Sequence, residues 1–231
     1  MFSKIIRTAA LAGMLTGAVQ AGEIEVKIVN NTGASNFTPL LVATHSNSIE
    51  LFKTGTAASN SLQAMAEGGN IAGLVTDLSA EDATIVEDPA AGLLAPGTNT
   101  VTNLTTDSSN DSLSIIAMIL PSNDGFIALN NWKVPTTPGT YKVTLNAYDA
   151  GTEANDEIVN GAGAPGEAGI PGDPGGNSGT GATGVNAEIE GFVHIHRGVL
   201  GDTDSTGGVS DLDATKHRWL NPIATAIITV K

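Results

Sequence analysis

The stretch Glu23-Ile24-Glu25-Val26-Lys27-Ile28 alternates polar and apolar residues without interruption. Because successive side chains of a strand point to opposite faces, this alternation predicts a strand with one buried face. Seven further segments carry strand patterns: Leu40–His45, Thr98–Leu104, Ser112–Leu120, Phe126–Asn130, Tyr141–Tyr148, Phe192–Val199 and Ile223–Val230. Clusters of Gly, Pro, Asn and Asp separate these segments. The sequence therefore predicts an all-β fold, an antiparallel β-sandwich of about eight strands.

Helical patterns are confined to two short segments, Ala57–Ala66 and Ile71–Leu78, which we expect to form peripheral helices that cover the sandwich. The main interruption of the strand pattern runs over residues 155–190. Within it, the stretch from Gly161 to Gly184 contains ten glycines and three prolines. So little apolar surface cannot form a core of its own, which predicts a long flexible loop inserted in the sandwich.

The first 21 residues have the pattern of a secretory signal peptide. Lys4 and Arg7 precede a small apolar stretch, and Val19-Gln20-Ala21 offers a small-residue cleavage site. We therefore expect a secreted domain over residues 22–231, whether periplasmic, attached to the cell surface or released. The apolar stretch is too short to cross a bilayer, and no later segment is longer, so we expect no transmembrane segment.

The charge balance restricts the possible partners. The 231 residues include 24 acidic and only 10 basic side chains, a formal net charge of −14, and no cysteine. Such a surface repels nucleic acids and anionic membranes, and it attracts multivalent cations. The absence of cysteine excludes disulfides and thiolate metal sites. Calcium can be millimolar outside cells, where even weak oxygen sites are occupied.

Two acidic turns are the strongest candidates for such a site. If consecutive strands run up, down and up, Asp124 and the turn Asp149–Glu153 lie at the same end of the sandwich. Gly151 lets the second turn fold back, so that Asp149 and Glu153 can point into one pocket. Carboxylates and backbone carbonyls are the ligands that calcium requires. Asp and Gly are also ordinary turn residues, and the spacing alone leaves that alternative open.

Five segments form an ordered set of motifs: Glu25–Asn30, Phe37–His45, Phe52–Ser59, Leu120–Phe126 and Ala147–Glu153. The first three resemble the opening of the spondin N-terminal domain, in its secreted bacterial form, and the last two resemble its two signature turns. The resemblance extends from about Glu23 to Val230. Unlike the animal members, this chain has no cysteine, and its segments Val193–Gly198 and His217–Pro222 resemble the bacterial branch.

The resemblance implies a β-sandwich similar to calcium-dependent membrane-binding domains. It also implies that Asp124, Asp149 and Glu153 are calcium ligands. The function it suggests is non-catalytic: a calcium-binding module for extracellular interaction, adhesion or matrix association, with an extracellular protein or polysaccharide as partner. Animal members commonly have Asp at the third position, so Glu153 would reach one methylene further.

The histidines support a different hypothesis, a zinc-dependent hydrolase. On a strand, His194 and His196 would share a face, and His217 or His45 could complete a site with three nitrogen ligands and an open water position. The same histidines could instead hydrogen-bond within the sheet. No nucleophile elbow or phosphate-binding loop is present in the sequence, so no further catalytic signature supports an enzyme.

A second calcium loop is suggested by Asp202, Asp204 and Asp213, whose spacing fits positions one, three and twelve of a calcium-binding loop. The helices that usually flank such a loop are missing, and a solvated acidic loop is the simpler interpretation. From the expected direction of Phe192–Val199, this segment should lie at the opposite end of the sandwich from Asp124.

A third functional hypothesis is purely structural. Unpaired edge strands of a sandwich can associate with other copies, so the chain could be a self-assembling subunit of a cell surface or biofilm. The sequence contains no feature that decides between this role and a monomeric module.

Overall fold

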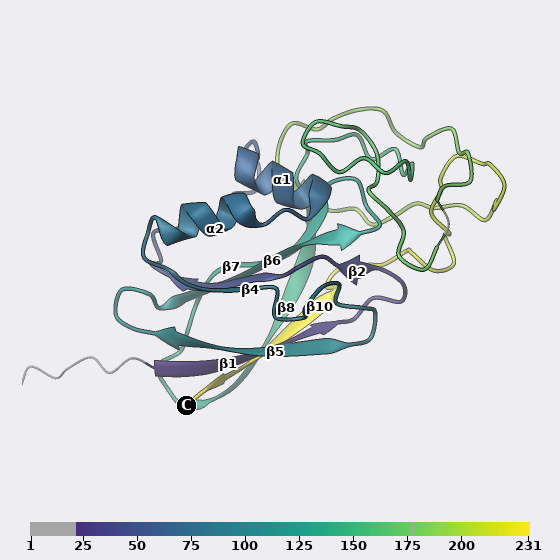
Figure 1. Ribbon diagram of the computed structural model, residues 1–231. Coiled ribbons are helices and arrows are strands. Elements are labelled where there is room, and N and C mark those ends of the chain that lie inside the picture. The colour runs from purple at the N-terminus through teal and green to yellow at the C-terminus, as the bar shows by residue number, and fades with distance from the viewer. Residues whose placement is uncertain (1–21, 177) are drawn as a thin grey trace, which may run out of the picture.

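The computed structural model describes residues 22–176 and 178–231, so the expected signal peptide lies outside the described residues (Figure 1). Within these described residues, ten strands and two helices make up the regular structure. The strands are β1 (Gly22–Asn30), β2 (Asn36–Phe37), β3 (Leu41–His45), β4 (Thr84–Glu87), β5 (Asn99–Thr106), β6 (Ser112–Leu120), β7 (Gly125–Lys133), β8 (Gly139–Asp149), β9 (His194–Ile195) and β10 (Ala224–Val230). The helices are α1 (Asn60–Gly68) and α2 (Ala72–Ser79).

All strand pairs between these elements are antiparallel, in the order β4-β3-β6-β7-β8-β10-β1-β5. β8 joins two layers, because its first part pairs with β10 and its last four residues pair with β7. The sheet then curls until its two ends approach, where the Thr44 hydroxyl donates to the Thr105 carbonyl at 2.7 Å. The expected all-β antiparallel class is confirmed. The detail differs, since one nearly closed, barrel-like sheet replaces two separate ones.

The alternation in β1 has the predicted consequence. Ile24, Val26 and Ile28 are fully buried, whereas Glu25 and Lys27 between them remain partly exposed. β1 pairs with β10 in a register that sets Val26 opposite Ile228. Together with apolar side chains from β3, β6, β7 and β8, they fill the space between the two layers.

A second core explains why β6 reads as an almost unbroken apolar run. Its outer face, with Ile116 and Met118, is covered by α1 and α2, which contribute Leu62, Met65 and Leu74. The expected covering helices are thus confirmed within about three residues. Ser59 begins α1, since its side chain accepts a hydrogen bond from the Leu62 amide at 3.1 Å.

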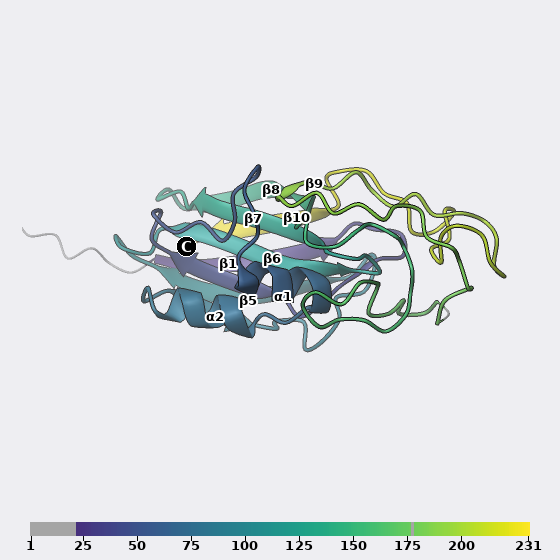
Figure 2. The ribbon, with the colours of Figure 1, turned by 90° about the horizontal axis from the view of Figure 1, so that it is seen from above.

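Long irregular segments gather at one end of the sheet, beyond β6 and the end of β8 (Figures 1 and 2). The expected strand Phe192–Val199 is reduced to the two-residue β9, because Val193 instead exchanges backbone hydrogen bonds with the loop at Gly55 and Thr56. Residues 155–190 contain no helix or strand among those described. They contribute Val159 and Ile170 to a small third apolar cluster, and their flexibility stays a prediction. No helix within the described residues is long and apolar enough to cross a membrane.

Candidate metal centre

The register of three strands places the predicted acidic turns together. Asp124 precedes β7 in the turn after β6, and Asp149 is the last residue of β8. Gly125 pairs with Asp149, which pairs on its other side with His194 of β9. The prediction that Asp124 and Asp149 lie at one end of the sandwich is confirmed, and His194 joins them there.

Asp124 is completely buried, and only one of its two carboxylate oxygens accepts hydrogen bonds. Its Oδ2 accepts hydrogen bonds from the backbone amides of Thr152 at 2.7 Å and Glu153 at 3.1 Å. Its Oδ1 has no hydrogen-bond partner among the described residues. Burial, and then the negative charge of Asp149, raise the pKa of Asp124 to about 7.

Asp149 is held in place on both oxygens. Oδ1 accepts from the Gly151 amide and Oδ2 from the Asn155 side chain, each at 2.8 Å. Gly151 has a φ of +67°, and a Cβ at that position would lie 2.3 Å from the Phe192 carbonyl oxygen. Glycine is therefore required where this turn meets the segment that leads to β9.

The Glu153 carboxylate contacts other groups than those of Asp124 and Asp149. Oε2 accepts from the Gly169 amide at 3.3 Å and from the Asn123 side chain at 3.5 Å, while Oε1 is buried without a partner in the described structure. Burial raises the pKa of Glu153 to about 8, with a further contribution from the charge of Glu67, a buried residue of α1. A calcium-ligand role for Glu153 stays a prediction. The sequence pattern gave no sign that Glu67 would lie beside it.

Glu190 and His194 extend the centre on the other side of Asp149. His194 Nε2 lies 3.5 Å from Asp149 Oδ1 and 3.8 Å from Glu190 Oε1. One ligand atom from each of these three residues lies within 4.8 Å of the others. Nothing in the sequence singles out Glu190, because an acid four residues before a histidine in a loop has no diagnostic pattern.

The other histidines have different partners. His196 Nδ1 accepts a hydrogen bond from the Gly198 amide at 3.0 Å, which places the proton of the neutral ring on Nε2. Burial lowers the pKa of His196 to about 4. His45 bonds within the sheet region to Ser46 and Ser114, and His217 lies 3.4 Å from Asp173. The structure therefore does not assemble a site with three histidines from the set that the hydrolase hypothesis named.

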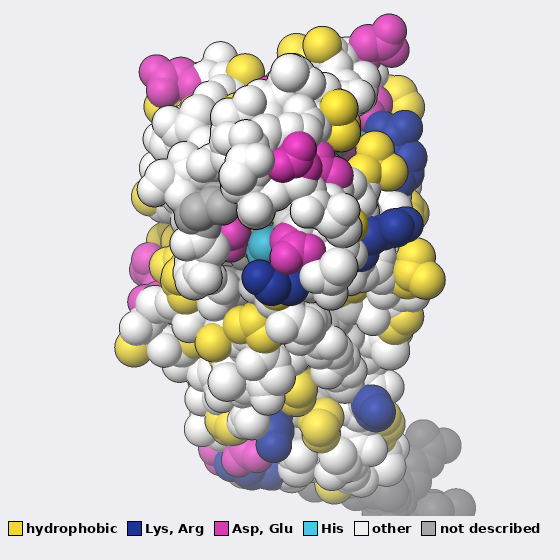
Figure 3. Space-filling model, turned by 90° about the vertical axis from the view of Figure 1, so that its right-hand side faces the viewer, with side chains coloured by type: hydrophobic (Ala, Val, Ile, Leu, Met, Phe, Trp, Pro, Cys, Tyr) yellow, Lys and Arg dark blue, Asp and Glu magenta, His cyan; other side chains and the backbone are white. Residues whose placement is uncertain are grey.

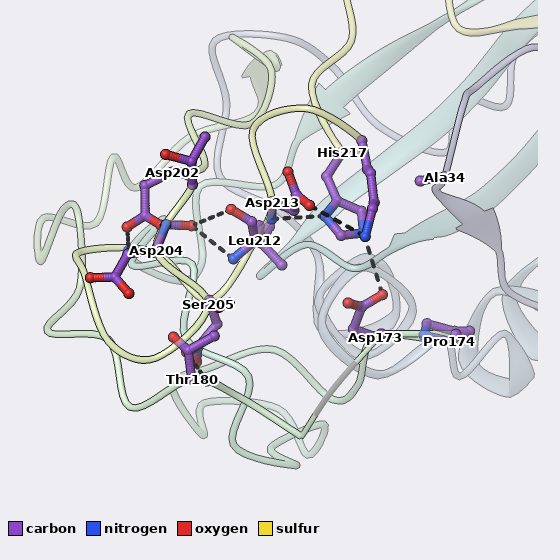
Figure 4. Close-up of a pocket in the computed structure, with 16 residues that line it drawn as sticks. Ala34, Asp173, Pro174, Thr180, Asp202, Asp204, Ser205, Leu212, Asp213 and His217 are labelled. Atoms are coloured by element: carbon purple, nitrogen blue, oxygen red, sulfur yellow. Dashed lines mark hydrogen bonds and ion pairs between the residues drawn. The ribbon is translucent and has the colours of Figure 1, made fainter.

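The expected second calcium loop lines a cavity of about 210 Å³, shown in Figure 4. Asp202 and Asp213 form a parallel bridge, and both are bonded within the loop: Asp202 accepts from the amides of Asp204, Val209 and Ser210. The expectation that this loop lies at the opposite end was wrong. Glu157, whose amide donates to Asn123 next to Asp124, also accepts from the amides of Leu200 and Gly201 and so ties the loop to the same end.

Figure 3 shows this end, where acidic, basic and apolar side chains are scattered over the surface and one histidine is visible between acidic and basic side chains. Asp149 and Glu190 of this candidate centre, together with Arg197, help to line a second cavity of about 410 Å³. A cation bound between Asp149 and Glu190 would therefore adjoin an open space and not a closed core.

Comparison with known families yields one match. The family model described as Spondin_N matches residues 30–158, more than half of the chain. A search of curated proteins finds no match. The matched region is shorter than the resemblance expected from the motifs. It includes Asp124, Asp149 and Glu153, whereas Glu190 and His194 lie outside it.

Proposed function

The chain belongs to the Spondin_N family, and on that premise we propose that it is a secreted, non-catalytic module that binds calcium at Asp124 and Asp149. In this proposal the ion fixes the loops at one end of the sheet, and those loops present a surface to an extracellular protein or polysaccharide. The signal-peptide pattern of residues 1–21 supports the secretion of the module.

One observation carries the calcium proposal: the buried Asp124 Oδ1 has no partner among the described residues, and it belongs to a carboxylate beside that of Asp149. A buried unpaired oxygen next to a second negative charge is costly, unless a proton or a cation compensates it. The donor atoms suit a hard cation, because Asp124 and Asp149 offer carboxylate oxygens. Since the two acids come from different turns, one ion would link both turns.

The connections of these two acids explain how an ion could order the loops. The Asp124 carboxylate accepts hydrogen bonds from the amides of Thr152 and Glu153. The Asp149 carboxylate accepts from the Gly151 amide and the Asn155 side chain. When bound, calcium would supply positive charge that keeps both carboxylates ionised in this position. The turn would then support the backbone near Phe192 through Gly151, whose carbonyl accepts from the Gly191 amide at 2.8 Å.

Thermal unfolding tests the proposal. Saturating calcium should raise the melting temperature over that in chelator, since a ligand at 100 times its Kd contributes about 2.7 kcal/mol of stability. Asp149→Asn should remove most of this increase. The matched control is Glu81→Gln, which removes the same charge from an exposed acid after α2 and should keep the increase. An identical melting curve with calcium and with chelator would refute the calcium site.

A further inference from the structure

His194 has an arrangement that a neutral ring alone does not explain. Its Nδ1 lies 2.9 Å from the Ile195 carbonyl oxygen, and because a carbonyl only accepts, Nδ1 carries a proton. In the neutral ring, Nε2 then has a lone pair and no proton. Yet Nε2 is the atom that lies beside the carboxylates of Asp149 and Glu190. A lone pair facing two carboxylates is repulsive, unless a positive charge lies between them.

A second proton on Nε2 could supply this charge, but the distances do not favour it. Charge-assisted hydrogen bonds from nitrogen to oxygen are typically about 2.7–2.9 Å long. The Nε2–oxygen distances here are 3.5 and 3.8 Å, and Nε2 has no hydrogen-bond partner in the described structure. Ligands bound to one tetrahedral zinc ion at about 2.0–2.2 Å lie roughly 3.3–3.6 Å apart. The Nε2–Asp149 distance of 3.5 Å matches this spacing and the Nε2–Glu190 distance of 3.8 Å is slightly longer, so small side-chain shifts would bring the three groups onto one ion.

The surroundings of the three groups are those of a prepared metal site. Ligating histidines usually donate their other ring N–H to a carbonyl or carboxylate, as His194 does to Ile195. Glu190 Oε1 accepts from Arg197 at 2.5 Å, which leaves the buried Oε2 without a partner among the described residues. Asp149 is fixed by Gly151 and Asn155.

Buried unpaired groups next to the cluster give a second indication. Asp124 Oδ1 and His196 Nε2 both lack hydrogen-bond partners within residues 22–176 and 178–231, and both residues are more than nine-tenths buried. His196 lines the same cavity as Asp149 and Glu190. Because its Nδ1 already accepts from the Gly198 amide, the Nε2–H is the donor of this ring that is left unpaired.

We propose that Asp149, Glu190 and His194 bind a divalent transition-metal ion of the zinc class through two carboxylates and one imidazole nitrogen. Imidazole favours zinc and related ions, whereas calcium takes oxygen ligands almost exclusively. The inference deepens the proposed function, on which it rests through the shared residue Asp149. It goes beyond that function because Glu190 and His194 lie outside the residues matched by the family model.

Isothermal titration of the metal-stripped full-length domain with Zn²⁺ and, separately, with Ca²⁺ tests this inference. We expect one zinc ion per chain and a loss of zinc affinity of at least about 100-fold in His194→Asn. The calcium-dependent increase in melting temperature should persist in that variant. The matched control is His217→Asn, which removes a histidine that pairs with Asp173 at the same end and should bind zinc like the parent.

Co²⁺ provides a second readout that does not depend on affinity. The visible absorption of Co²⁺ bound in place of zinc should change when the imidazole is removed, and it should be unchanged in His217→Asn. Glu190→Gln serves if His194→Asn does not fold, because Glu190 is a partly exposed loop residue outside both large cores.

The outcomes separate the two proposals. Unchanged zinc affinity in His194→Asn, or no zinc binding by the parent protein, would overturn the inference and leave the calcium proposal intact if calcium still stabilises. Zinc binding that requires His194, without any effect of calcium, would support the inference and refute the calcium assignment.

Discussion

The Asp124–Asp149 centre and the Asp202–Asp213 loop contain the same residue type at the same end of the molecule, but their carboxylates are used differently. At the first, Asp124 Oδ1 is buried without a described partner. In the second, Asp202 accepts hydrogen bonds from backbone amides, and Thr215 donates to Asp213 through both its amide and its hydroxyl. The pKa values respond accordingly: that of Asp124 is raised, and those of Asp202 and Asp213 are lowered.

The difference shows that acidic residues at calcium-like spacing do not by themselves identify a cation site. A carboxylate whose oxygens accept from the chain is already stabilised, and a cation would have to replace or share those hydrogen bonds. A buried carboxylate with an unpaired oxygen still requires a partner. Asp149 also accepts on both oxygens, so the unpaired Oδ1 of Asp124, and not the sequence spacing, distinguishes the candidate metal centre from a loop that folds around its own acids.

Matched acid-to-amide substitutions should give the largest difference in the free energy of unfolding between satisfied and unpaired buried acids. Glu157 is a satisfied buried acid, which accepts from Leu200, Gly201 and the Ser210 hydroxyl at 2.6, 2.8 and 2.5 Å. Glu157→Gln replaces one acceptor oxygen by a donor, so we expect a loss of about 2 kcal/mol in the free energy of unfolding. Chemical denaturation in chelator measures it.

Asp124→Asn should behave in the opposite way under the same conditions. It removes a negative charge beside Asp149, and its amide can place a donor where Oδ1 was unpaired. We expect unchanged or increased stability in chelator, together with a lost response to calcium. A destabilisation equal to that of Glu157→Gln would show that the two acids have equivalent environments and would end the contrast.

The pH dependence of stability should also differ in sign between the regions. Burial raises the pKa of Asp124 from 3.8 to about 7, so between these values the folded state binds more protons than the unfolded state. Stability in chelator should therefore fall as the pH rises through this window. Glu153 adds the same trend between 4.5 and about 8. Calcium should reduce the slope by compensating Asp124.

The acids of the Asp202–Asp213 loop affect stability at lower pH. Hydrogen bonds from Thr215 lower the pKa of Asp213 from 3.8 to about 2, so its contribution is complete above 3.8 and is lost as the pH falls through about 2. Melting temperatures from pH 2 to 9, for the parent protein and for Asp124→Asn, measure both trends. A parent slope between pH 5 and 8 that Asp124→Asn does not flatten would contradict the assignment to Asp124.

The fold could be predicted where side-chain periodicity determines burial. The alternation at Glu23–Ile28 identified β1, and the strand segments anticipated β6, β7, β8 and β10. The four-residue β4 was missed because its side chains are only partly buried or exposed and give no strong pattern. The length of β9 was overestimated, since the pairing of Val193 with the Gly55–Thr56 loop depends on tertiary contacts that local propensity does not encode.

The centre could be predicted only in the part that strand order determines. Consecutive antiparallel strands bring Asp124 to Asp149, and the register confirms it. Glu190 and Glu67 approach through long connections, whose course depends on single contacts such as that of Gly151 with the Phe192 backbone. For the same reason the position of Asp202–Asp213 was predicted wrongly: Glu157 brings that loop back through hydrogen bonds that no periodicity reveals.

The smallest effect is expected for Asp202→Asn, which tests the satisfied loop directly. Asp202 accepts three backbone amides, and its loop is largely exposed, so water can replace part of what the charge supplied. We expect a decrease in melting temperature of no more than about 2 °C, with calcium and zinc responses equal to those of the parent protein. The measurement is thermal unfolding in chelator, in calcium and in zinc. A loss of either metal response would mean that this loop binds the ion despite its internal hydrogen bonds, so that unpaired carboxylate oxygens would no longer distinguish the two regions.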